Sequence, residues 1–518
     1  MLAKTYSFGI QGLEAYPVTI EVFVSGGLPS TIIVGLPDNA IRESKERVRS
    51  AIKNCGYKFE PRRITVNLSP ADTKKEGPSF DLAMALGILA ATKQINADSL
   101  EQFAVLGELS LDGSIHPIRG ALAIALAMAH HKTEQPALSS FRGLILPSLN
   151  APEAAIVPDV PLYPVKNLEE VIYLLNNPGL VEPFKADPLK YANALSSYDI
   201  DFCDVKGQAY AKRGLEIAAA GGHNVLMLGP PGSGKSMLAK RLVTILPDMT
   251  WEETLETTKI HSVMGLLKND QALVKTRPFR SPHHTSSDIA LVGGGSLPKA
   301  GEVTLSHNGL LFLDELPEFN RNVLEALRQP LEDRFVTVAR ASKTLKFPAK
   351  FMLVAAMNPC PCGWMTDKRQ RCQCTSFQIQ KYMSKISGPL LDRIDLHLEV
   401  PALPSIELLS SHSQENSLAI KERTTQARLR QHERFARSPI RANAEMNHRQ
   451  VKEFCPLTSE CKSLLKQAIE ELNLSARAYD KVLKVARTIA DLAKAENIFP
   501  EHLAEAIQYR SLDRGLWK

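Results

Sequence analysis

A glycine-rich segment, Gly-Pro-Pro-Gly-Ser-Gly-Lys-Ser at residues 229–236, constrains this chain more than any other feature of its sequence. It has the spacing G-x-x-x-x-G-K-[ST] of a phosphate loop. An apolar run at 223–228 precedes it and a helical pattern at 236–246 follows it, as such a loop requires. Glycines let backbone N–H groups wrap a phosphate at a helix N-terminus, where partial positive charge favours an anion. The segment predicts an α/β fold that binds a nucleotide.

The positions of this loop have distinct expected roles. Lys235 is expected to reach the β- and γ-phosphates, and the Ser236 hydroxyl to ligate Mg²⁺. The rest of the cradle is expected to be Gly229, Pro230, Pro231, Gly232, Ser233 and Gly234.

A second apolar strand pattern, Leu-Leu-Phe-Leu-Asp-Glu at 310–315, ends in two carboxylates. We expect Asp314 to hold Mg²⁺ and Glu315 to orient or deprotonate the attacking water. The alternative is that two buried strands carry unrelated polar ends. Together the two motifs predict an enzyme that hydrolyses ATP with Mg²⁺.

The bulk composition describes an ordinary core-forming protein. A chain of 518 residues should hold two to four domains, and 44% hydrophobic with 23% charged residues is typical of globular proteins. The net charge of +6 does not by itself indicate a nucleic-acid partner. The N-terminus lacks the apolar segment of a signal peptide, and the apolar runs 82–91 and 121–129 are too short to cross a bilayer. Eight cysteines without a secretory signal then favour thiols or a metal site, so a cytoplasmic protein without membrane contact is expected.

Three domains are expected: 1–185, 186–400 and 401–518. The first alternates strand and helix signals, with Asp38 as the N-cap of a helix through Asn54 and Gly56 as its stop. Its other expected elements are strands at Val18–Val24, Ser30–Leu36 and Arg62–Leu68 and a buried helix at Phe80–Thr92. The third domain shows helical patterns alone, at Ser459–Leu472, Ala476–Ala495 and Glu501–Tyr509.

An α/β nucleotide core followed by an all-helical lid resembles the AAA+ ATPases. In this resemblance Asn358, at the end of an apolar strand, matches the sensor that holds the attacking water or the γ-phosphate. Arg477, at the start of a lid helix, is the candidate second sensor. A solvated arginine at a helix start is its alternative.

The segment Leu-Leu-Asp-Arg-Ile-Asp at 390–395 resembles the arginine-finger motif of that family. Arg393 would reach across a subunit boundary to the γ-phosphate held by a neighbour, a contact that can change rate by orders of magnitude. An ion pair with Asp392 or Asp395 is the alternative.

A long insert and a hairpin surround the second motif. Adjacent His283 and His284 in the insert should face opposite ways in an extended segment, so they make a poor metal pair and are interpreted as insert or channel residues. The spacing after Glu315 predicts a hairpin ahead of the sensor strand. The basic residues near its tip, which in the resemblance project into the channel of a hexamer and contact DNA, are Arg340, Lys343 and Lys346.

Several motifs in a fixed order make the resemblance more specific. They are Arg-Pro-Phe-Arg-Ser-Pro-His-His-Thr at 277–285, Gly-Gly-Gly followed by Pro-Lys-Ala-Gly-Glu at 293–302, Leu-Phe-Leu-Asp-Glu, Met-Asn-Pro-Cys-Pro-Cys-Gly at 357–363 and Leu-Leu-Asp-Arg-Ile-Asp. From end to end the chain resembles the magnesium-chelatase-related ComM/YifB proteins of bacteria. That resemblance implies a homo-hexameric motor that drives DNA branch migration and assists integration of incoming single-stranded DNA during natural transformation. Single-stranded or branched DNA would be its partner, with recombination proteins as further partners.

Half of the cysteines fall within 15 residues, as Cys360, Cys362, Cys372 and Cys374. Four thiolates can close a tetrahedral Zn²⁺ site, and a filled set of four favours a structural role over a catalytic one. The C-x-C spacing is tighter than the usual C-x₂-C, so reduced thiols and a redox pair stay open as alternatives.

The N-terminal domain resembles the peptidase domain of Lon-type proteases. Gly77-Pro-Ser-Phe-Asp81 matches the nucleophile region, yet Leu122 stands where the catalytic lysine belongs. Ser79 therefore lacks the amine that a Ser–Lys dyad requires, and we interpret it as a helix cap. The expectation is a Lon-like α+β domain without peptidase activity, serving as a scaffold or a DNA-contacting ring.

Other function classes stay open at this point. The basic stretch Lys421–Arg449 fits either a phosphate-binding surface or a solvated lid face. The alternatives to a DNA motor are a magnesium-chelatase-type motor and a protein-remodelling ATPase. An ATP-dependent peptidase is disfavoured by Leu122.

Overall fold

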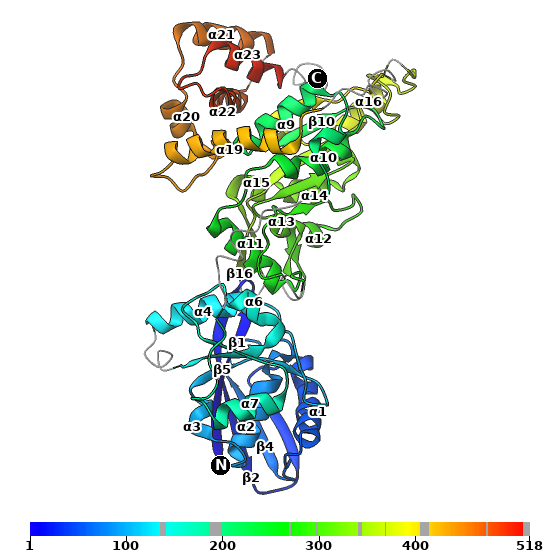
Figure 1. Cartoon of the computed structure of the whole chain (residues 1–518). Helices are drawn as coiled ribbons and strands as arrows, with labels where there is room; N and C mark the ends of the chain where they lie inside the picture. Colours follow the sequence, from blue (N-terminus) through cyan, green and yellow to red (C-terminus); the bar gives the residue numbers. More distant parts are fainter. Residues whose placement is uncertain are drawn as a thin grey trace. The chain divides into compact units, whose positions relative to one another are not determined.

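A computed structural model describes residues 1–134, 141–185, 198–268, 271–295, 299–339, 344–367, 369–404, 414–472 and 475–510 (Figure 1). The chain divides into two compact units. The N-terminal unit combines Met1–Leu195 with Trp251–Val274, and the ATPase unit combines Ser196–Thr250 with Lys275–Lys518. The predicted division at 185/186 and 400/401 stays a prediction. The sequence did not indicate that residues 251–274, which follow the phosphate loop and its helix in the chain, pack with the first unit.

The N-terminal unit is built on a seven-stranded sheet with the strand order β3-β4-β2-β1-β5-β8-β9. The strands pair antiparallel from β1 to β2 and from β2 to β4, and parallel at the other neighbours. Their bounds are β1 Leu2–Gln11, β2 Glu14–Ser25, β3 Ser30–Val34, β4 Arg63–Ser69, β5 Phe103–Val105, β8 Gly143–Pro147 and β9 Leu162–Val165. Between β5 and β8 lies a small hairpin of β6 (Glu108–Leu109) and β7 (Ile115–His116).

Helices cover this sheet, and the longer ones follow the sequence pattern. Helix α1 (Asn39–Asn54) begins after Asp38, whose carboxylate accepts from the Ile41 amide at 2.9 Å, and Gly56 beyond its end has φ +79°. Helix α2 (Asp81–Ala91) is buried at every residue. These two predictions are confirmed. The other helices are α3 Ala97–Leu100, α4 Ala121–Glu134, α6 Ala151–Ala154 and α7 Leu168–Asn176.

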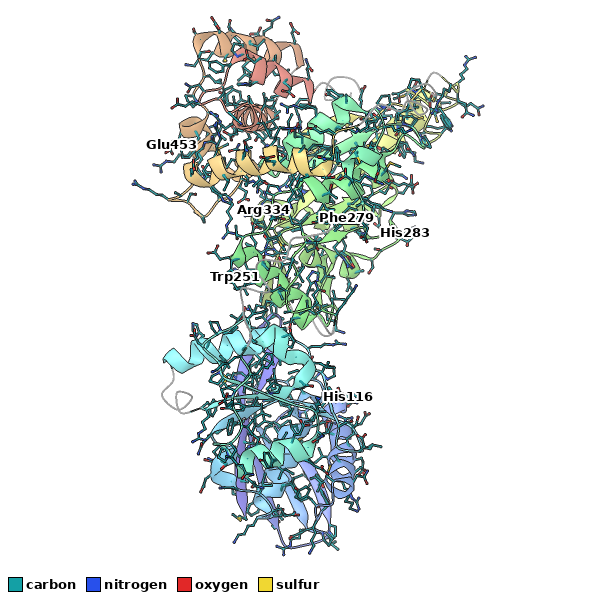
Figure 2. The ribbon with its side chains drawn as sticks, in the orientation of Figure 1. His116, Trp251, Phe279, His283, Arg334 and Glu453 are labelled. Atoms are coloured by element: carbon teal, nitrogen blue, oxygen red, sulfur yellow. The ribbon has the colours of Figure 1, made fainter. Side chains whose placement is uncertain are left out.

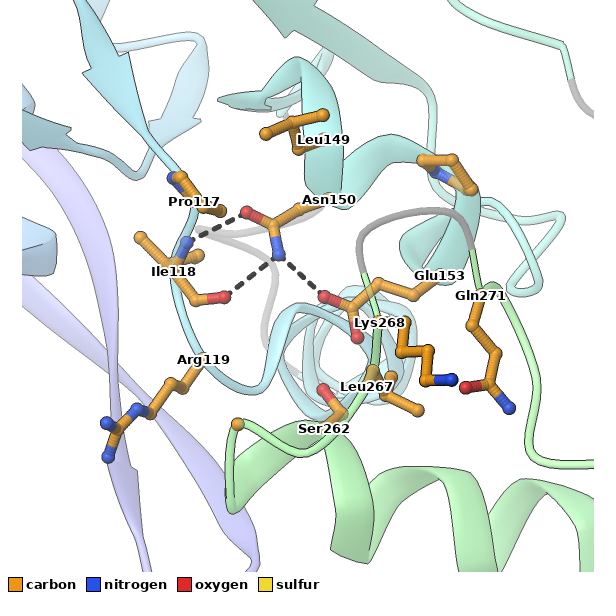
Figure 3. Close-up of a pocket in the computed structure, with 12 residues that line it drawn as sticks. Pro117, Ile118, Arg119, Leu149, Asn150, Glu153, Ser262, Leu267, Lys268 and Gln271 are labelled. Carbon is orange, nitrogen blue, oxygen red and sulfur yellow. Dashed lines mark hydrogen bonds between the residues drawn. The ribbon is translucent and has the colours of Figure 1, made fainter.

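The segment Trp251–Val274 belongs to this unit and consists of helix α11 (Trp251–Val263) and the residues after it. Ala272 and Leu273 belong to the same apolar cluster as Phe8 and Leu122. Beside this packing lies a cavity of about 170 Å³, shown in Figure 3. In it Asn150 bonds both the amide and the carbonyl of Ile118 at 2.9 Å and the Glu153 carboxylate at 2.7 Å.

The ATPase unit contains a five-stranded parallel sheet with the order β11-β14-β17-β10-β18. Its strands are β10 Val225–Leu228, β11 Phe279–Arg280, β14 Leu310–Leu313, β17 Met352–Met357 and β18 Leu396–Glu399. Strands β10, β14 and β17 are buried throughout, as expected for a sheet covered on both faces. Because parallel strands end at one edge, the loops after β10, β14 and β17 meet there.

Short helices surround this sheet: α9 Ala209–Gly221, α10 Lys235–Leu242, α12 Asp288–Val292, α13 Glu302–Leu305, α14 Arg321–Ala326, α15 Arg328–Asp333, α16 Ser376–Met383 and α17 Gly388–Leu391. The insert between β11 and β14 also contains two short strands that pair with each other, β12 (Gly293–Gly294) and β13 (Lys299–Ala300). Arg280 at the start of the insert bonds both carboxylate oxygens of Glu302, at 2.5 and 2.7 Å. The hairpin predicted ahead of the sensor strand is present as β15 (Phe335–Ala339) paired antiparallel with β16 (Thr344–Pro348).

The C-terminal region contributes α19 Ser417–Arg434, α20 His448–Phe454, α21 Ser459–Leu472, α22 Ala476–Leu492 and α23 Pro500–Gln508, drawn in orange to red in Figure 1. Its apolar side shares one core with the sheet, in which Ile489 of α22 and Leu398 of β18 belong to the same cluster. The three predicted helices are confirmed with shifts of up to three residues at their ends.

Two arginines of the basic stretch Lys421–Arg449 bond helix α9. Arg423 bonds Glu216 at 2.6 Å, and Arg428 bonds the carbonyls of Ala219 and Ala220 at 3.0 Å. These two guanidinium groups bond partners within the chain, and for the rest of the stretch the phosphate-binding surface and the solvated lid face both stay predictions. Among the residues that the structure covers, no helix has the length and apolar character needed to cross a membrane.

Candidate nucleotide-binding site

The phosphate loop links β10 to α10 and forms an open cradle of backbone amides. Gly232 and Gly234 have φ of +74° and +94°, and a Cβ at either would meet nothing within 4 Å. Gly229 is needed for packing, because a Cβ there would lie 2.1 Å from the Val400 carbonyl oxygen. The Ser233 hydroxyl is buried without a hydrogen-bond partner in the described structure. Open glycines, an unpaired hydroxyl and a helix N-terminus fit a bound phosphate group.

Lys235 lies at the centre of the site. Its Nζ donates to the carbonyls of Gly229 at 2.6 Å and Pro230 at 2.9 Å and to Asn358 Oδ1 at 3.1 Å. Burial lowers the pKa of Lys235 to about 8, while the charges of Asp314 and Glu315 act to raise it. A phosphate would act in the same direction as those carboxylates, so nucleotide binding favours the charged form.

The ends of α10 and β14 bring two oxygen groups together. The Ser236 hydroxyl donates to Asp314 Oδ2 at 2.5 Å. A hydroxyl and a carboxylate at this spacing suit a hard cation such as Mg²⁺. Glu315 follows with φ +53°, and its side chain is 54% exposed. Its carboxylate therefore remains accessible to water, as a general base must be.

His284 is a partner of Glu315 that sequence reasoning missed. Its Nδ1 lies 3.5 Å from Glu315 Oε2, and its ring packs edge-on against Phe319. The rings of His283 and His284 are 4.1 Å apart at 32°, so the prediction that the two side chains face opposite ways is wrong. The chain turns at this point instead of running extended, with the Ser286 amide bonded to the His283 carbonyl at 2.9 Å.

The place of these histidines follows from strand order. Phe279 of β11 stacks on Phe312 of β14 with ring centroids 6.1 Å apart, and His283 follows in the next loop (Figure 2). Because β11 is the neighbour of β14, residues after β11 lie beside residues after β14. Knowledge of that strand order would have indicated the contact with Glu315.

Asn358 stands at the carboxyl end of β17, as predicted for a sensor, and its contact with Lys235 joins it to the phosphate loop. Burial raises the pKa of the Tyr382 phenol of α16, and the backbone of Asn358 acts to lower it.

The two candidate arginines bond within the chain. Arg393 donates to the Pro389 carbonyl at 2.7 Å and pairs with Glu332, a partner that the sequence did not indicate. Arg477 is 66% exposed and lies 3.7 Å from Asp392. Arg477 thus contacts Asp392, the residue next to Arg393 in the chain, and not the side chains around Lys235.

One of the three hairpin residues lies in the described part of the chain. Lys346 is exposed on β16, with its Nζ 5.0 Å from the centre of the Phe335 ring. Arg340 and Lys343 lie outside the described residues.

The four clustered cysteines converge as a metal site requires. Their sulfur atoms all lie within 4.8 Å of one another, with Cys360 Sγ 3.3 Å from Cys362 Sγ and 3.7 Å from Cys372 Sγ. Zn–S bonds of ~2.3 Å in a tetrahedron place the sulfurs about 3.8 Å apart, so the set fits Zn²⁺. The backbone at Trp364 and Gln373 lowers the pKa of the Cys362 thiol to about 6, whereas burial raises the pKa of the Cys360 thiol.

Ser79 does not cap a helix. It lies in the 3-10 turn Pro78–Phe80, and neither that turn nor α2 receives a side-chain cap. The backbone carbonyl of Ser79 accepts a hydrogen bond from the Gly107 amide at 3.0 Å. Leu122 is fully buried in the apolar cluster beside α4.

Comparison with known families covers nearly the whole chain. The family described as magnesium chelatase, subunit ChlI, matches residues 201–408, and the ChlI C-terminal family matches 414–510. A further family, subunit ChlI of Mg-chelatase, matches 20–141, within the N-terminal unit.

Two relatives extend over the full length of the chain, and a third matches part of it. The competence protein ComM of Haemophilus influenzae is 45% identical over 522 residues, covering 100% of this chain and 99% of its own. The uncharacterized protein YifB of Salmonella typhimurium is 43% identical over 517 residues, covering 99% and 98%. The DNA helicase MCM8 of Bos taurus is 26% identical over 208 residues, covering 40% of this chain and 22% of its own.

Proposed function

This chain belongs to the ComM/YifB family of magnesium-chelatase-related AAA+ proteins, and from that premise we propose that it is a hexameric ATPase motor acting on DNA. Its work would be branch migration that integrates incoming single-stranded DNA during natural transformation, carried out in the cytoplasm. The observation that carries the ATPase part is the convergence of Lys235, Ser236, Asp314 and Asn358 beside an open glycine cradle. The DNA part rests on full-length similarity to a competence protein.

The site residues divide the chemistry of ATP hydrolysis among them. The loop amides and Lys235 bind the phosphates, and Ser236 with Asp314 holds Mg²⁺. Bound there, Mg²⁺ neutralises charge on the β- and γ-phosphates. Glu315 accepts a proton from the attacking water, and Asn358 orients that water or the γ-phosphate.

Hexamer assembly completes the site. Arg393 reaches the γ-phosphate of a neighbouring subunit, which requires that it leave Glu332. Arg477 acts as the second sensor from the lid, and its release from Asp392 costs little because an exposed ion pair of this kind is worth ~0–1 kcal/mol.

DNA is gripped by the β15–β16 hairpin through Arg340, Lys343 and Lys346. The exposure of Lys346 supports this assignment. Phosphate contacts by these residues release counterions, so DNA binding should weaken steeply with salt.

The remaining assignments concern structure. The four cysteines hold one structural Zn²⁺, and the sulfur spacing supports this. The N-terminal domain is Lon-like and acts as a scaffold without peptidase activity, in line with Leu122 at the position of the lysine.

A magnesium-chelatase motor is the second candidate, because the matched families carry that description over 201–408 and 414–510. A protein-remodelling ATPase is the third. Turnover of ATP by the purified protein, measured with single-stranded DNA, branched DNA, an unfolded protein or no addition, separates the DNA motor from the protein-remodelling ATPase. We expect DNA to stimulate ATP turnover and the unfolded protein not to. Stimulation by the unfolded protein and not by DNA would contradict the proposal and favour protein remodelling.

A further inference from the structure

The four-cysteine cluster lies directly against the candidate nucleotide site. Cys360 comes two residues after Asn358, the residue that bonds Lys235. The cluster therefore begins where the sensor strand ends.

Gly363, inside the cluster, touches the phosphate loop. It is buried between half-buried neighbours, has φ +83°, and its amide donates to the Cys360 carbonyl at 2.9 Å. A Cβ at this position would lie 2.6 Å from Cδ and 2.7 Å from Cγ of Pro231, and 3.9 Å from Cγ of Asn358. Only a glycine lets the cysteine loop approach Pro231 so closely.

The far end of the cluster reaches Asn358 by a second route. Cys374 is followed by Thr375, whose hydroxyl caps α16 by accepting from the Gln378 amide at 3.3 Å. Tyr382 on that helix lies near enough to the Asn358 backbone for that backbone to act to lower the pKa of the phenol, which burial raises overall. The cysteines at both ends of the cluster are thus connected to Asn358, Cys360 directly along the chain and Cys374 through helix α16.

We propose that a zinc ion held by Cys360, Cys362, Cys372 and Cys374 controls ATP affinity, because it fixes the loop that supports Pro231 and Asn358 from outside. A closed tetrahedral site pins four points of a loop that otherwise has few apolar contacts. Without the metal, Gly363 and Asn358 lose their fixed positions, and the phosphate loop loses one wall. The inference rests on the proposed ATPase function and adds a metal requirement for nucleotide binding.

The test compares full-length protein as purified, after treatment with a zinc-selective chelator in excess Mg²⁺, and after zinc is returned. Metal content is measured by elemental analysis, and affinity by titration with the fluorescent nucleotide mant-ATP. We expect about one zinc per chain, a Kd about tenfold higher without it, and recovery on re-addition.

Two variants separate the metal from the contact that it supports. Gly363→Ala should keep its zinc yet bind mant-ATP about fivefold more weakly, since its methyl group pushes on Pro231. Gly56→Ala is the matched control, because Gly56 has φ +79° and open space around its Cβ position. It should bind the nucleotide as the unaltered protein does.

The outcomes are distinct. Absence of metal in protein purified without chelator overturns the inference. So does an unchanged Kd in zinc-free protein that still unfolds cooperatively, and in both cases the ATPase proposal stands. Zinc-loaded protein that binds no mant-ATP would overturn the proposed function itself.

Discussion

Within the proposed site, two side chains make different contacts. Lys235 contacts the phosphate loop and Asn358, whereas Glu315 is turned toward solvent and His284. Binding and hydrolysis should therefore respond separately to mutation.

Lys235→Ala should raise the Kd for ATP, since it removes the positive charge from the cradle. Glu315→Gln should keep ATP binding and lower kcat by about 10²–10⁴, because it removes the base alone. Equilibrium binding and single-turnover hydrolysis measure the two effects. If Glu315→Gln hydrolysed ATP at the normal rate, the assignment of Glu315 would be wrong.

His284→Ala should lower kcat by about tenfold with little change in KM, since His284 positions Glu315 and does not contact the phosphate loop. His284→Gln keeps an N–H donor and should recover part of the rate. His283→Ala is the neighbouring control, because the contact with Glu315 comes from His284. A rise in kcat would show instead that the His284 contact restrains Glu315.

These residues also show what sequence could supply. The phosphate loop and the residues expected to hold Mg²⁺ are local motifs, and the structure brings Ser236 and Asp314 within hydrogen-bond distance. The His284 contact depends on β11 being the neighbour of β14, and the Arg393–Glu332 pair joins residues 61 positions apart. A single sequence does not encode such pairings in any local pattern.

At the scale of elements, a buried polar network joins strand β10 to the lid. Asp395 lies 3.1 Å from the Asn224 amide, 3.5 Å from His223 and 3.6 Å from Lys481 of α22. Asn224 in turn bonds the Leu353 amide at 2.8 Å. The network therefore ties the sensor strand and the lid helix to the strand that carries the phosphate loop.

Asp395→Asn should destabilise the ATPase unit by about 3–5 kcal/mol, because it leaves Lys481 buried without its carboxylate. Asp392→Asn, which removes an exposed pair, should cost less than ~1 kcal/mol. Calorimetric unfolding of both variants measures the difference, and equal effects would contradict this account.

The same carboxylate predicts a pH dependence. Burial alone would raise the pKa of Asp395, but Lys481 and His223 hold it far below its usual range. A folded-state pKa below the unfolded one stabilises the protein above about pH 4, and this stability is lost as pH falls further. Asp395→Asn should flatten the loss of stability in acid. An identical acid profile would show that other groups dominate.

At the scale of the whole molecule, the proposed function needs a neighbouring subunit. Arg393→Ala should keep DNA binding and abolish hydrolysis in the assembled ring, whereas Lys235→Ala should fail at nucleotide binding. In mixed rings, an interface that pairs an intact Arg393 with an intact Lys235 should regain activity. Verified mixed hexamers without any recovery would show that Arg393 does not act across the interface.

The segment Trp251–Val274 also affects how the chain folds while it is being synthesised. Its Ala272 and Leu273 complete an apolar cluster that begins at Phe8. A ribosome delivers residues in order, so the phosphate loop leaves the exit tunnel before the N-terminal unit has all of its core. The nascent N-terminal unit thus cannot finish folding before the ATPase unit has begun to emerge. A fragment that ends at residue 185 would lack Ala272 and Leu273, so the apolar core of its N-terminal unit would stay incomplete.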